Sequence, residues 1–386
     1  MRMFAYPLLG LSLGLSIASY AAEPGITDGG ILLGMVNAQT GPAASLGQGM
    51  YHGAMAAFDE VNARGGVNGR KITLILDDDG YEPDRAIAGT RKMIDEKRVF
   101  ALFGYVGTPT ANAVLPIVKE THVPLIGVFS GAMTLRQPVT PEVINIRPSY
   151  DDETETLVDH FVNDTGAKRF AVFYQNDGFG AAVLSGVDKA LRKRNLDIVA
   201  KGAFERNTID VAAGLAAVKQ GDPDVVIMAG PYSPLTAFVK AAKEQNLKAQ
   251  LATVSFVGTE AFVNSLGVTD QNVFISQVMP YPGDITVPVV ATCTRLMQRY
   301  YPNEALGFIN LEGCVTAKAL LIALEKTGRD LTREGLLKSF EGLHHVDLHG
   351  LDLTFAEDDH QALSKVFLTR IDNGKIWSIT DLKVAP

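Results

Sequence analysis

Hydrophobic positions along the chain follow two alternating patterns. Short, nearly continuous apolar runs alternate with longer segments in which apolar residues return every three or four positions. The short runs predict buried β-strands, and the longer segments predict amphipathic helices. Strands that alternate with helices of ~10–15 residues are typical of parallel sheets with helices on both faces. The pattern therefore predicts an α/β fold.

The alternation occurs twice, which predicts two α/β lobes joined near residues 147–152. The first series predicts strands at 31–36, 72–76, 100–103 and 123–126, with helices at 49–63, 84–96 and 110–120. The second predicts strands at 170–174, 198–203, 225–228, 251–254 and 273–278, with helices at 153–163, 181–194, 211–219 and 235–246.

The last third of the chain departs from this rhythm. Pro280 and Pro282 break any regular element within residues 277–284. Residues 288–340 are mostly helical and poor in strands, so we expect them to pack back on the first lobe. The tail predicts strands at 351–355, 366–371 and 375–379, the last two joined by a turn at Asn373-Gly374.

The first 22 residues have the pattern of a secretory signal peptide. Arg2 precedes an apolar run at 8–17, and Ser19 and Ala21 are small residues at cleavage-site spacing. A membrane anchor is the alternative, but this run is shorter than the ~20 apolar residues of a span. We therefore expect a cleaved leader and a periplasmic mature chain.

Charge and cysteine content mainly argue against two classes of protein, nucleic-acid-binding proteins and cysteine-rich zinc modules. With 35 Lys+Arg against 43 Asp+Glu and a net charge of −8, the chain is a poor candidate for binding nucleic acid. Cys293 and Cys314 are too few for a cysteine-rich zinc module. They lie on predicted helices 289–301 and 310–327. The sequence is compatible with a disulfide between them and with two buried free thiols.

Sequence signatures of catalysis are missing. Apart from Gly-Leu-Ser-Leu-Gly at 10–14, within the expected leader, the chain has no G-x-S-x-G sequence. It has no P-loop either, and its Gly-rich stretch at 65–71 precedes a strand, as a turn would. Asp77, Asp78 and Asp79 follow a strand, where carboxylates cap turns. No H-E-x-x-H motif accompanies four histidines expected in a solvated loop: His344, His345, His349 and His360. We expect no enzyme, cofactor or metal.

Loops that follow the predicted strands carry more chemistry. Ligands of open α/β sheets bind beyond the carboxyl ends of the strands. Four such loops are rich in hydroxyl groups, glycine and aromatic residues: 39–47, 105–110, 127–132 and 230–233. Thr110 begins a predicted helix and suits a carboxylate, although simple capping is the alternative for any one residue. Together the loops favour a small-molecule cleft.

Several passages carry a resemblance to a known family. The most specific is the helix–Asn-x-x-Gly-Gly-x-Asn-Gly–strand passage within 56–71. The others are 34–49, 77–79, 104–112, 123–130, 174–180 and 225–232. The chain resembles type I periplasmic solute-binding proteins, in the branched-chain amino acid (Leu/Ile/Val-binding) family of ABC transporter receptors.

The resemblance implies two lobes that close over a ligand, with three crossings of the chain between them. Lobe 1 would comprise 26–147 and 279–350, and lobe 2 would comprise 148–278 and 351–386. The implied partners are a small-molecule ligand and an ABC-type membrane permease, with no nucleic acid, and the implied state is a monomer. A sensory ligand-binding protein is the alternative, and an enzyme is a more distant one.

The resemblance also implies the binding residues. A carboxylate anchor falls on Thr110 and Ala111, followed by Ser130 with Gly131 or Ala132. Phe179 would cover the ligand from lobe 2. Further expected contacts are Leu46 and Thr108, and the expected aromatic walls include Tyr105, Phe129, Tyr232 and Phe256.

Ser255 marks a departure from the amino-acid binders of this family. They usually hold the ligand's ammonium with an acidic residue, at the position where the approximate register places Ser255. A buried ammonium without a partner would cost several kcal/mol. Glu260 is the alternative for this position. We therefore expect a small organic acid, aromatic ones included, or an amino acid.

Overall fold

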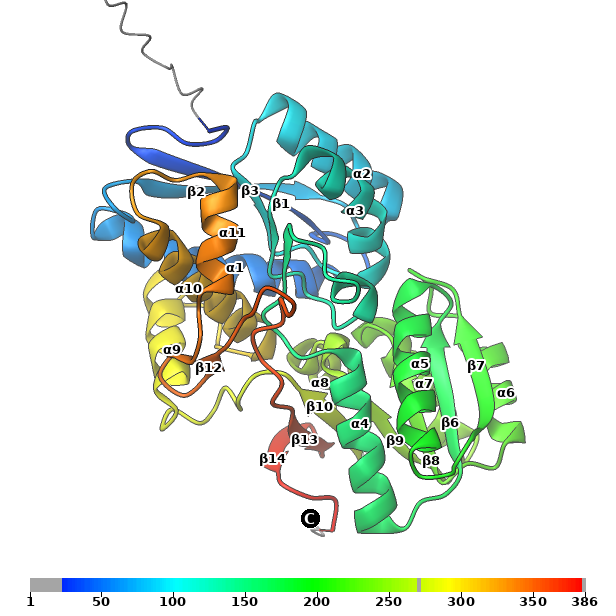
Figure 1. Ribbon diagram of the computed structural model, residues 1–386. Helices are drawn as coiled ribbons and strands as arrows, with labels where there is room; N and C mark the ends of the chain where they lie inside the picture. The colour runs from blue at the N-terminus through cyan, green and yellow to red at the C-terminus, as the bar shows by residue number, and fades with distance from the viewer. Residues whose placement is uncertain (1–22, 269–271, 384–386) are drawn as a thin grey trace, which may run out of the picture.

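The computed structural model describes residues 23–268 and 272–383, so the expected leader at 1–22 lies outside the described residues. Its strands form two separate main sheets (Figure 1). The first is entirely parallel, in the order β2-β1-β3-β4-β5. Its strands are β1 (Gly30–Asn37), β2 (Lys71–Asp78), β3 (Ala101–Phe103), β4 (Leu125–Ile126) and β5 (Val143–Ile144).

The second sheet has the order β14-β13-β10-β9-β8-β6-β7 and is parallel from β10 to β7. The antiparallel strands β13 and β14 close one edge. Its strands are β6 (Phe170–Gln175), β7 (Ile198–Phe204), β8 (Val225–Ala229), β9 (Gln250–Thr253), β10 (Val273–Gln277), β13 (Phe367–Asp372) and β14 (Lys375–Ile379). The predicted two-lobed α/β fold is confirmed, and we call the first sheet with its helices lobe 1 and the second lobe 2.

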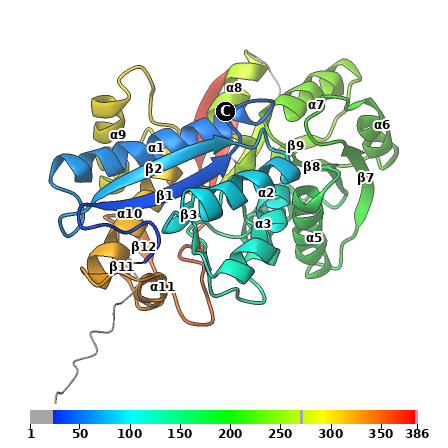
Figure 2. The same cartoon turned by 90° about the horizontal axis from the view of Figure 1, so that it is seen from above.

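Helices cover both faces of the first sheet (Figure 2). Helices α2 (Pro83–Arg91) and α3 (Thr108–Thr121) pack on one face, and α1 (Ala44–Ala63) and α10 (Phe308–Thr327) lie on the other. Helices α1 and α10 approach so closely that a Cβ on Gly53 would lie 1.9 Å from the carbonyl oxygen of Asn310. Helices α9 (Pro288–Tyr300) and α11 (Arg333–Glu341) pack beside α1 and α10, as the sequence predicts for 288–340.

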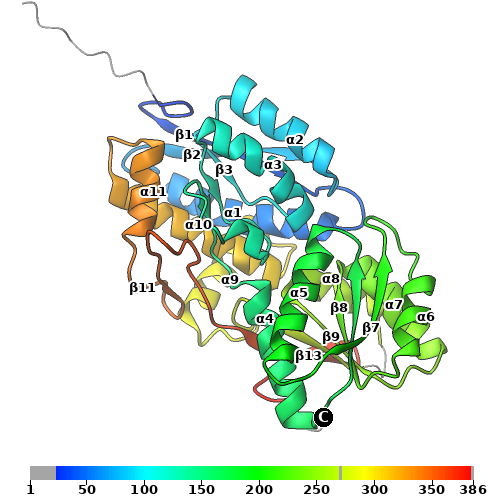
Figure 3. The same cartoon turned by 45° about the vertical axis from the view of Figure 1, so that its right-hand side comes forward.

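The second sheet is covered in the same way (Figure 3). Helices α4 (Tyr150–His160) and α5 (Gly178–Arg192) pack on one face. Helices α6 (Ala212–Gln220), α7 (Tyr232–Glu244) and α8 (Thr259–Leu266) pack on the other. Short helical turns complete the fold at Lys92–Glu96, Met133–Leu135, Phe161–Thr165 and Ser255–Val257.

The chain passes between the lobes three times. It leaves lobe 1 after β5, returns after β10, and crosses again before β13. The strands β11 (Val346–Asp347) and β12 (Asp352–Leu353) pair with each other in a small sheet that spans the predicted bound at 350. The lobe bounds stay a prediction, and we propose that the third crossing follows β12.

Two side-chain predictions have a clear outcome. Cys293 and Cys314 form a disulfide between α9 and α10, so the free-thiol alternative does not hold. His360 corrects the expectation of a solvated loop, because it is buried and its Nδ1 lies 2.9 Å from the carbonyl oxygen of Val143. Its neighbours His344, His345 and His349 are exposed.

The described residues contain neither a candidate metal site nor a candidate membrane-spanning helix. Within 23–268 and 272–383, no group of three or more His, Cys, Asp or Glu is placed to hold a metal ion. Over the same residues, no helix is both long and apolar enough to cross a membrane.

Candidate functional site

Five aromatic rings meet where the two lobes face each other. Lobe 1 contributes Tyr81 and Phe129, and lobe 2 contributes Tyr150, Phe179 and Phe256; all five are at most 1% exposed. The ring of Phe256 is central, with centroids 4.4 Å from Phe179, 5.6 Å from Phe129 and 6.0 Å from Tyr81. Tyr150 lies 5.3 Å from Phe179. The structure thus joins the predicted Phe129 and Phe179 in one interlobe cluster.

Hydroxyl and backbone groups line the lobe 1 side of this cluster. The Oγ1 of Thr108 and the Oγ of Ser130 are 2.8 Å apart. The carbonyl of Gly131 accepts a 2.7 Å hydrogen bond from the amide of Tyr150, where a Cβ on Gly131 would lie 2.6 Å from that nitrogen. Three of the predicted residues, Thr108, Ser130 and Gly131, therefore lie together at the interlobe face.

The start of α3 is committed to the helix itself. The hydroxyl of Thr110 donates to the carbonyl of Val106 at 2.6 Å. The amide of Ala111 donates to the carbonyl of Gly107 at 3.1 Å. This corrects the expectation that the Ala111 amide faces a ligand, because it already closes the first helical turn.

Tyr105 lies on the other side of the first sheet. Its hydroxyl is 2.8 Å from that of Thr90 on α2, and its ring packs among the residues beneath α2 and α3. The expectation that Tyr105 lines the cleft is therefore corrected. Successive side chains on an extended segment point to opposite faces, and that of Tyr105 points to the face covered by α2 and α3.

Leu46 and Tyr232 lie at lobe-to-lobe contacts. Gly258 of lobe 2 has φ +77°, and a Cβ there would lie 2.6 Å from Cδ2 of Leu46. The Tyr232 hydroxyl accepts a 3.3 Å hydrogen bond from Oγ of Ser45 in α1. Both predicted residues thus join α1 to lobe 2.

A buried charged cluster surrounds Ser255. The Nη2 of Arg147 donates to Oγ of Ser255, and its Nε lies 3.2 Å from Oε1 of Glu312. Glu153 accepts from the Ser255 amide at 2.8 Å, from the Ser255 hydroxyl at 3.0 Å and from the Ser276 hydroxyl at 2.7 Å. Arg147 also stacks on Phe129, with its guanidinium carbon 4.3 Å from the ring centroid. The cluster therefore adjoins the aromatic rings.

Three charged members of this cluster are absent from the sequence prediction: Arg147, Glu153 and Glu312. One signal was available for Glu312, because it is an acid among mostly apolar residues of a buried helix. Arg147 stood at the predicted lobe boundary, but nothing in the sequence shows where its long side chain ends.

Burial dominates the electrostatics of this cluster. It raises the pKa of Glu312 to about 7, although the nearby Arg147 opposes the rise. Burial also raises the pKa of Glu153, against the opposing effects of Arg147 and of its serine donors. The cluster thus contains a carboxyl group, Glu312, that titrates near neutral pH.

Glu260 holds the lobes together at another point. Its Oε1 accepts a 2.9 Å hydrogen bond from the amide of Phe308, the first residue of α10. A carboxylate is favoured at the N-terminus of a helix, where amides lack partners within the helix. Burial raises the pKa of Glu260. Its carboxyl group is therefore engaged with lobe 1.

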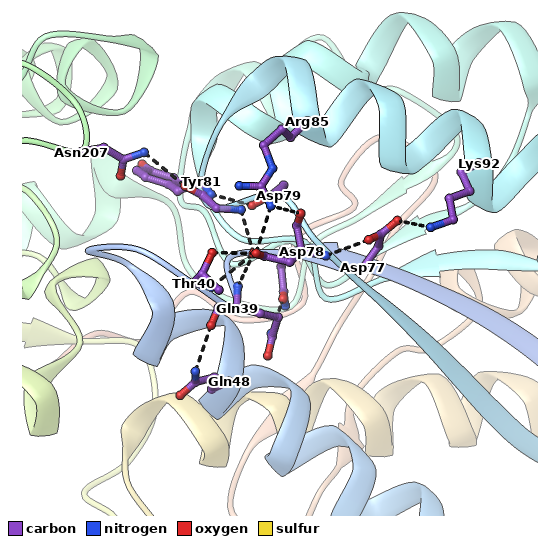
Figure 4. A network of polar contacts seen from close by, with 12 residues as sticks. Gln39, Thr40, Gln48, Asp77, Asp78, Asp79, Tyr81, Arg85, Lys92 and Asn207 are labelled. Atoms are coloured by element: carbon purple, nitrogen blue, oxygen red, sulfur yellow. Dashed lines mark hydrogen bonds and ion pairs between the residues drawn. The ribbon is translucent and has the colours of Figure 1, made fainter.

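Asp78 orders the rim of the cleft on lobe 1 (Figure 4). Its carboxylate accepts from the amides of Gln39 at 2.8 Å and Gly80 at 2.8 Å and from the Thr40 hydroxyl at 2.6 Å. Asn207 of lobe 2 donates to the carbonyl of Gly80 at 3.1 Å. The carboxylate thus shapes a loop that touches lobe 2.

The substitution Asp78→Asn should lower the free energy of unfolding by about 2 kcal/mol at pH 7. Burial alone would raise the pKa of Asp78, but its hydrogen-bond donors outweigh burial and lower the pKa to about 2. A lowered pKa gives stability that is complete above the unfolded value of 3.8 and is lost as the pH falls toward 2. Urea unfolding at pH 7 and pH 2 tests this; equal losses at both would contradict it.

These features define the class of protein: two α/β lobes, three crossings, and a buried aromatic and charged site between them. The family model described as "Periplasmic binding protein" matches residues 30–375. The chain therefore belongs to the periplasmic binding protein family, in its type I branch with the branched-chain amino acid receptors.

Individual relatives agree with this assignment. A solved structure from Rhodopirellula baltica SH 1, described as a possible leucine/isoleucine/valine-binding protein, is 35% identical with TM-score 0.87, covering 91% of this chain and 96% of that one. An "Amino acid binding protein" of Pseudomonas aeruginosa is 24% identical over 61% of this chain. "Leu/Ile/Val-binding protein homolog 7" of Brucella abortus is 25% identical over 61% of this chain. The matches span 63% and 61% of these two curated relatives. All three are described as binding proteins rather than enzymes.

Proposed function

We propose that this protein is a periplasmic receptor that captures a small carboxylate-bearing ligand between its lobes and delivers it to an ABC-type permease. The observation that carries the proposal is the buried cluster of rings contributed by both lobes, with charged groups beside it. Binding sites for small molecules are mostly apolar with a few placed polar groups. The relatives reported above, which are named as amino acid-binding or leucine/isoleucine/valine-binding proteins, support the same function.

Lobe closure gives the proposal its mechanism. A ligand that touches both lobes favours the closed arrangement of the lobes. It does so only through the interactions that it makes in the closed arrangement and not in the open one. Here the lobes meet through Phe256, which contacts Phe129 and Tyr81. Polar contacts at the rim add to this, including Arg206 of lobe 2 with Glu82 of lobe 1 at 2.9 Å.

The rings themselves indicate what a ligand would replace. With the lobes in contact, the cavity beside Phe129 and Arg147 measures only about 10 Å³, which is room for one water. A larger ligand would therefore take the place of ring packing, chiefly that of Phe256 on Phe129. The replaced packing is apolar, so an apolar body attached to an acidic group suits the site.

Ligand binding should raise the thermal stability of the full chain. A ligand at ~100 times its dissociation constant adds about 2.7 kcal/mol. We would refold the protein to remove carried-over ligand and screen leucine, isoleucine, valine, 4-methyl-2-oxopentanoate, phenylacetate and benzoate. A rise in melting temperature with at least one of these, confirmed by calorimetric titration, supports the function. A flat response to all six contradicts a receptor for small carboxylates.

A further inference from the structure

The buried side of the cleft contains a cation with unused hydrogen-bonding capacity. Arg147 is 1% exposed and lines the 10 Å³ cavity together with Ser255, Gln277 and Glu312. Its Nη2 binds Ser255 and its Nε faces Glu312. Among the described residues, none accepts a hydrogen bond from its Nη1, which is fully buried. A buried donor without a partner is uncommon in proteins and calls for an explanation.

The charges around the cavity favour an anion over a cation. Two arginines, Arg136 and Arg147, and two acids, Glu153 and Glu312, are buried there. Glu153 is saturated by donors from Ser255 and Ser276. The Nη1 donor of Arg147 therefore has no acceptor among these acids, and an anionic oxygen of a ligand in the cavity supplies one. An ammonium group would instead add a second cation beside the Arg147 guanidinium.

The hydrogen bonds of the other arginine show that the two are not equivalent. Arg136 donates to backbone carbonyls of Ser130 at 3.1 Å, Ala132 at 3.0 Å and Arg147 at 2.9 Å. Its guanidinium therefore braces the chain at the first crossing. Arg147 is the arginine that reaches the cavity.

Resting on the proposed function, we propose that Arg147 binds an oxygen acceptor of the ligand through Nη1 and thereby selects organic acids over α-amino acids. The ring of Phe129 packs against the guanidinium, and Ser255 fixes one edge of it. A carboxylate or carbonyl oxygen of the ligand accepts a hydrogen bond from the unused Nη1 donor. An ammonium group in the same place is repelled by the positively charged guanidinium. Arg147 is thus a specificity-determining residue of the cleft.

The test uses two matched pairs of probes on the full chain. Leucine and 4-methyl-2-oxopentanoate share one carbon skeleton, and the second has a carbonyl oxygen where the first has ammonium. Phenylacetate and phenylacetamide differ only in the acidic group. We expect the wild-type protein to bind the oxo acid and phenylacetate about 10-fold to 100-fold more tightly than their partners, as one charge-assisted hydrogen bond allows.

Variants separate this role from a merely structural one. Arg147→Met should abolish the preference within each pair, and Arg147→Lys, which keeps the charge, should retain part of it. Arg333→Met is the matched control, because Arg333 binds the carbonyls of Val99 and Phe100 outside the cleft. It should keep the full preference even if stability falls. The readout is a ratio of affinities, which loss of stability alone does not change.

Each other outcome has a definite meaning. Tighter binding of leucine than of its oxo analogue, or an undiminished preference in Arg147→Met, overturns the role of Arg147 and leaves the receptor function standing. If Arg147→Met does not fold, the Arg147→Lys ratio decides: an unchanged wild-type ratio overturns the proposal. A wild-type protein that binds none of the four probes contradicts both the receptor function and this proposal.

Discussion

Replacing Cys293 and Cys314 together by alanine should lower the free energy of unfolding by about 3 kcal/mol. The disulfide closes a loop with a sequence separation of 21 residues, and the entropy that such a loop removes from the unfolded chain corresponds to ~3 kcal/mol. Both cysteines are almost fully buried, so alanine also leaves a small gap. Guanidinium unfolding of both proteins measures the difference.

The wild-type protein unfolded in the presence of a reductant is the control. It has the same sequence without the cross-link, so its stability should approach that of the double variant. If the reduced and oxidised wild-type proteins unfold at the same denaturant concentration, the cross-link does not stabilise the fold. The bond joins α9 to α10, the helix that carries Glu312, so its loss should also loosen one wall of the cleft.

The alternation of strands and helices was readable from the sequence because buried parallel strands are continuous apolar runs. Strand β8, for example, is buried at every position and was predicted within one residue. Strand β5 was missed because it has only two residues, Val143 and Ile144, too few to show a period. Helix α8 was missed for a related reason, since its eight residues follow directly on a short helical turn.

The candidate site was predictable only in part. The loop at 127–132, at the carboxyl end of a strand, indicated Phe129, and the family resemblance indicated Phe179. The charged cluster depends on residues far apart in the chain: Glu153 accepts from Ser276, 123 positions away. Such pairings are set by the packing of α4 against β10, which no local pattern specifies. The same limit explains Tyr105, because the composition of its loop does not show to which face of the sheet its side chain points.

Glu312→Gln should make the protein more stable than wild type at pH 8 by about 3 kcal/mol and leave it nearly unchanged at pH 4.5. Burial raises the pKa of Glu312 from 4.5 to about 7, so between these values the folded chain keeps a proton that the unfolded chain loses. Stability therefore falls as the pH rises through this range, by ~1.4 kcal/mol per unit of pKa difference. Glutamine, neutral at every pH, removes this loss.

The charged groups around Glu312 set the size of this effect. Arg147 and Arg136 lower its pKa and Glu153 raises it, but burial outweighs them.

Asp79→Asn is the matched control, because burial raises the pKa of Asp79 to about 7 at a different place in lobe 1. It should show a similar pH-dependent gain without changing ligand preference, whereas Glu312→Gln changes the charge that faces Arg147. Urea unfolding of the three proteins from pH 4.5 to 8 measures these differences. Parallel curves for wild type and Glu312→Gln would show that Glu312 has the same pKa in the folded and unfolded protein, and that its pairing with Arg147 balances burial.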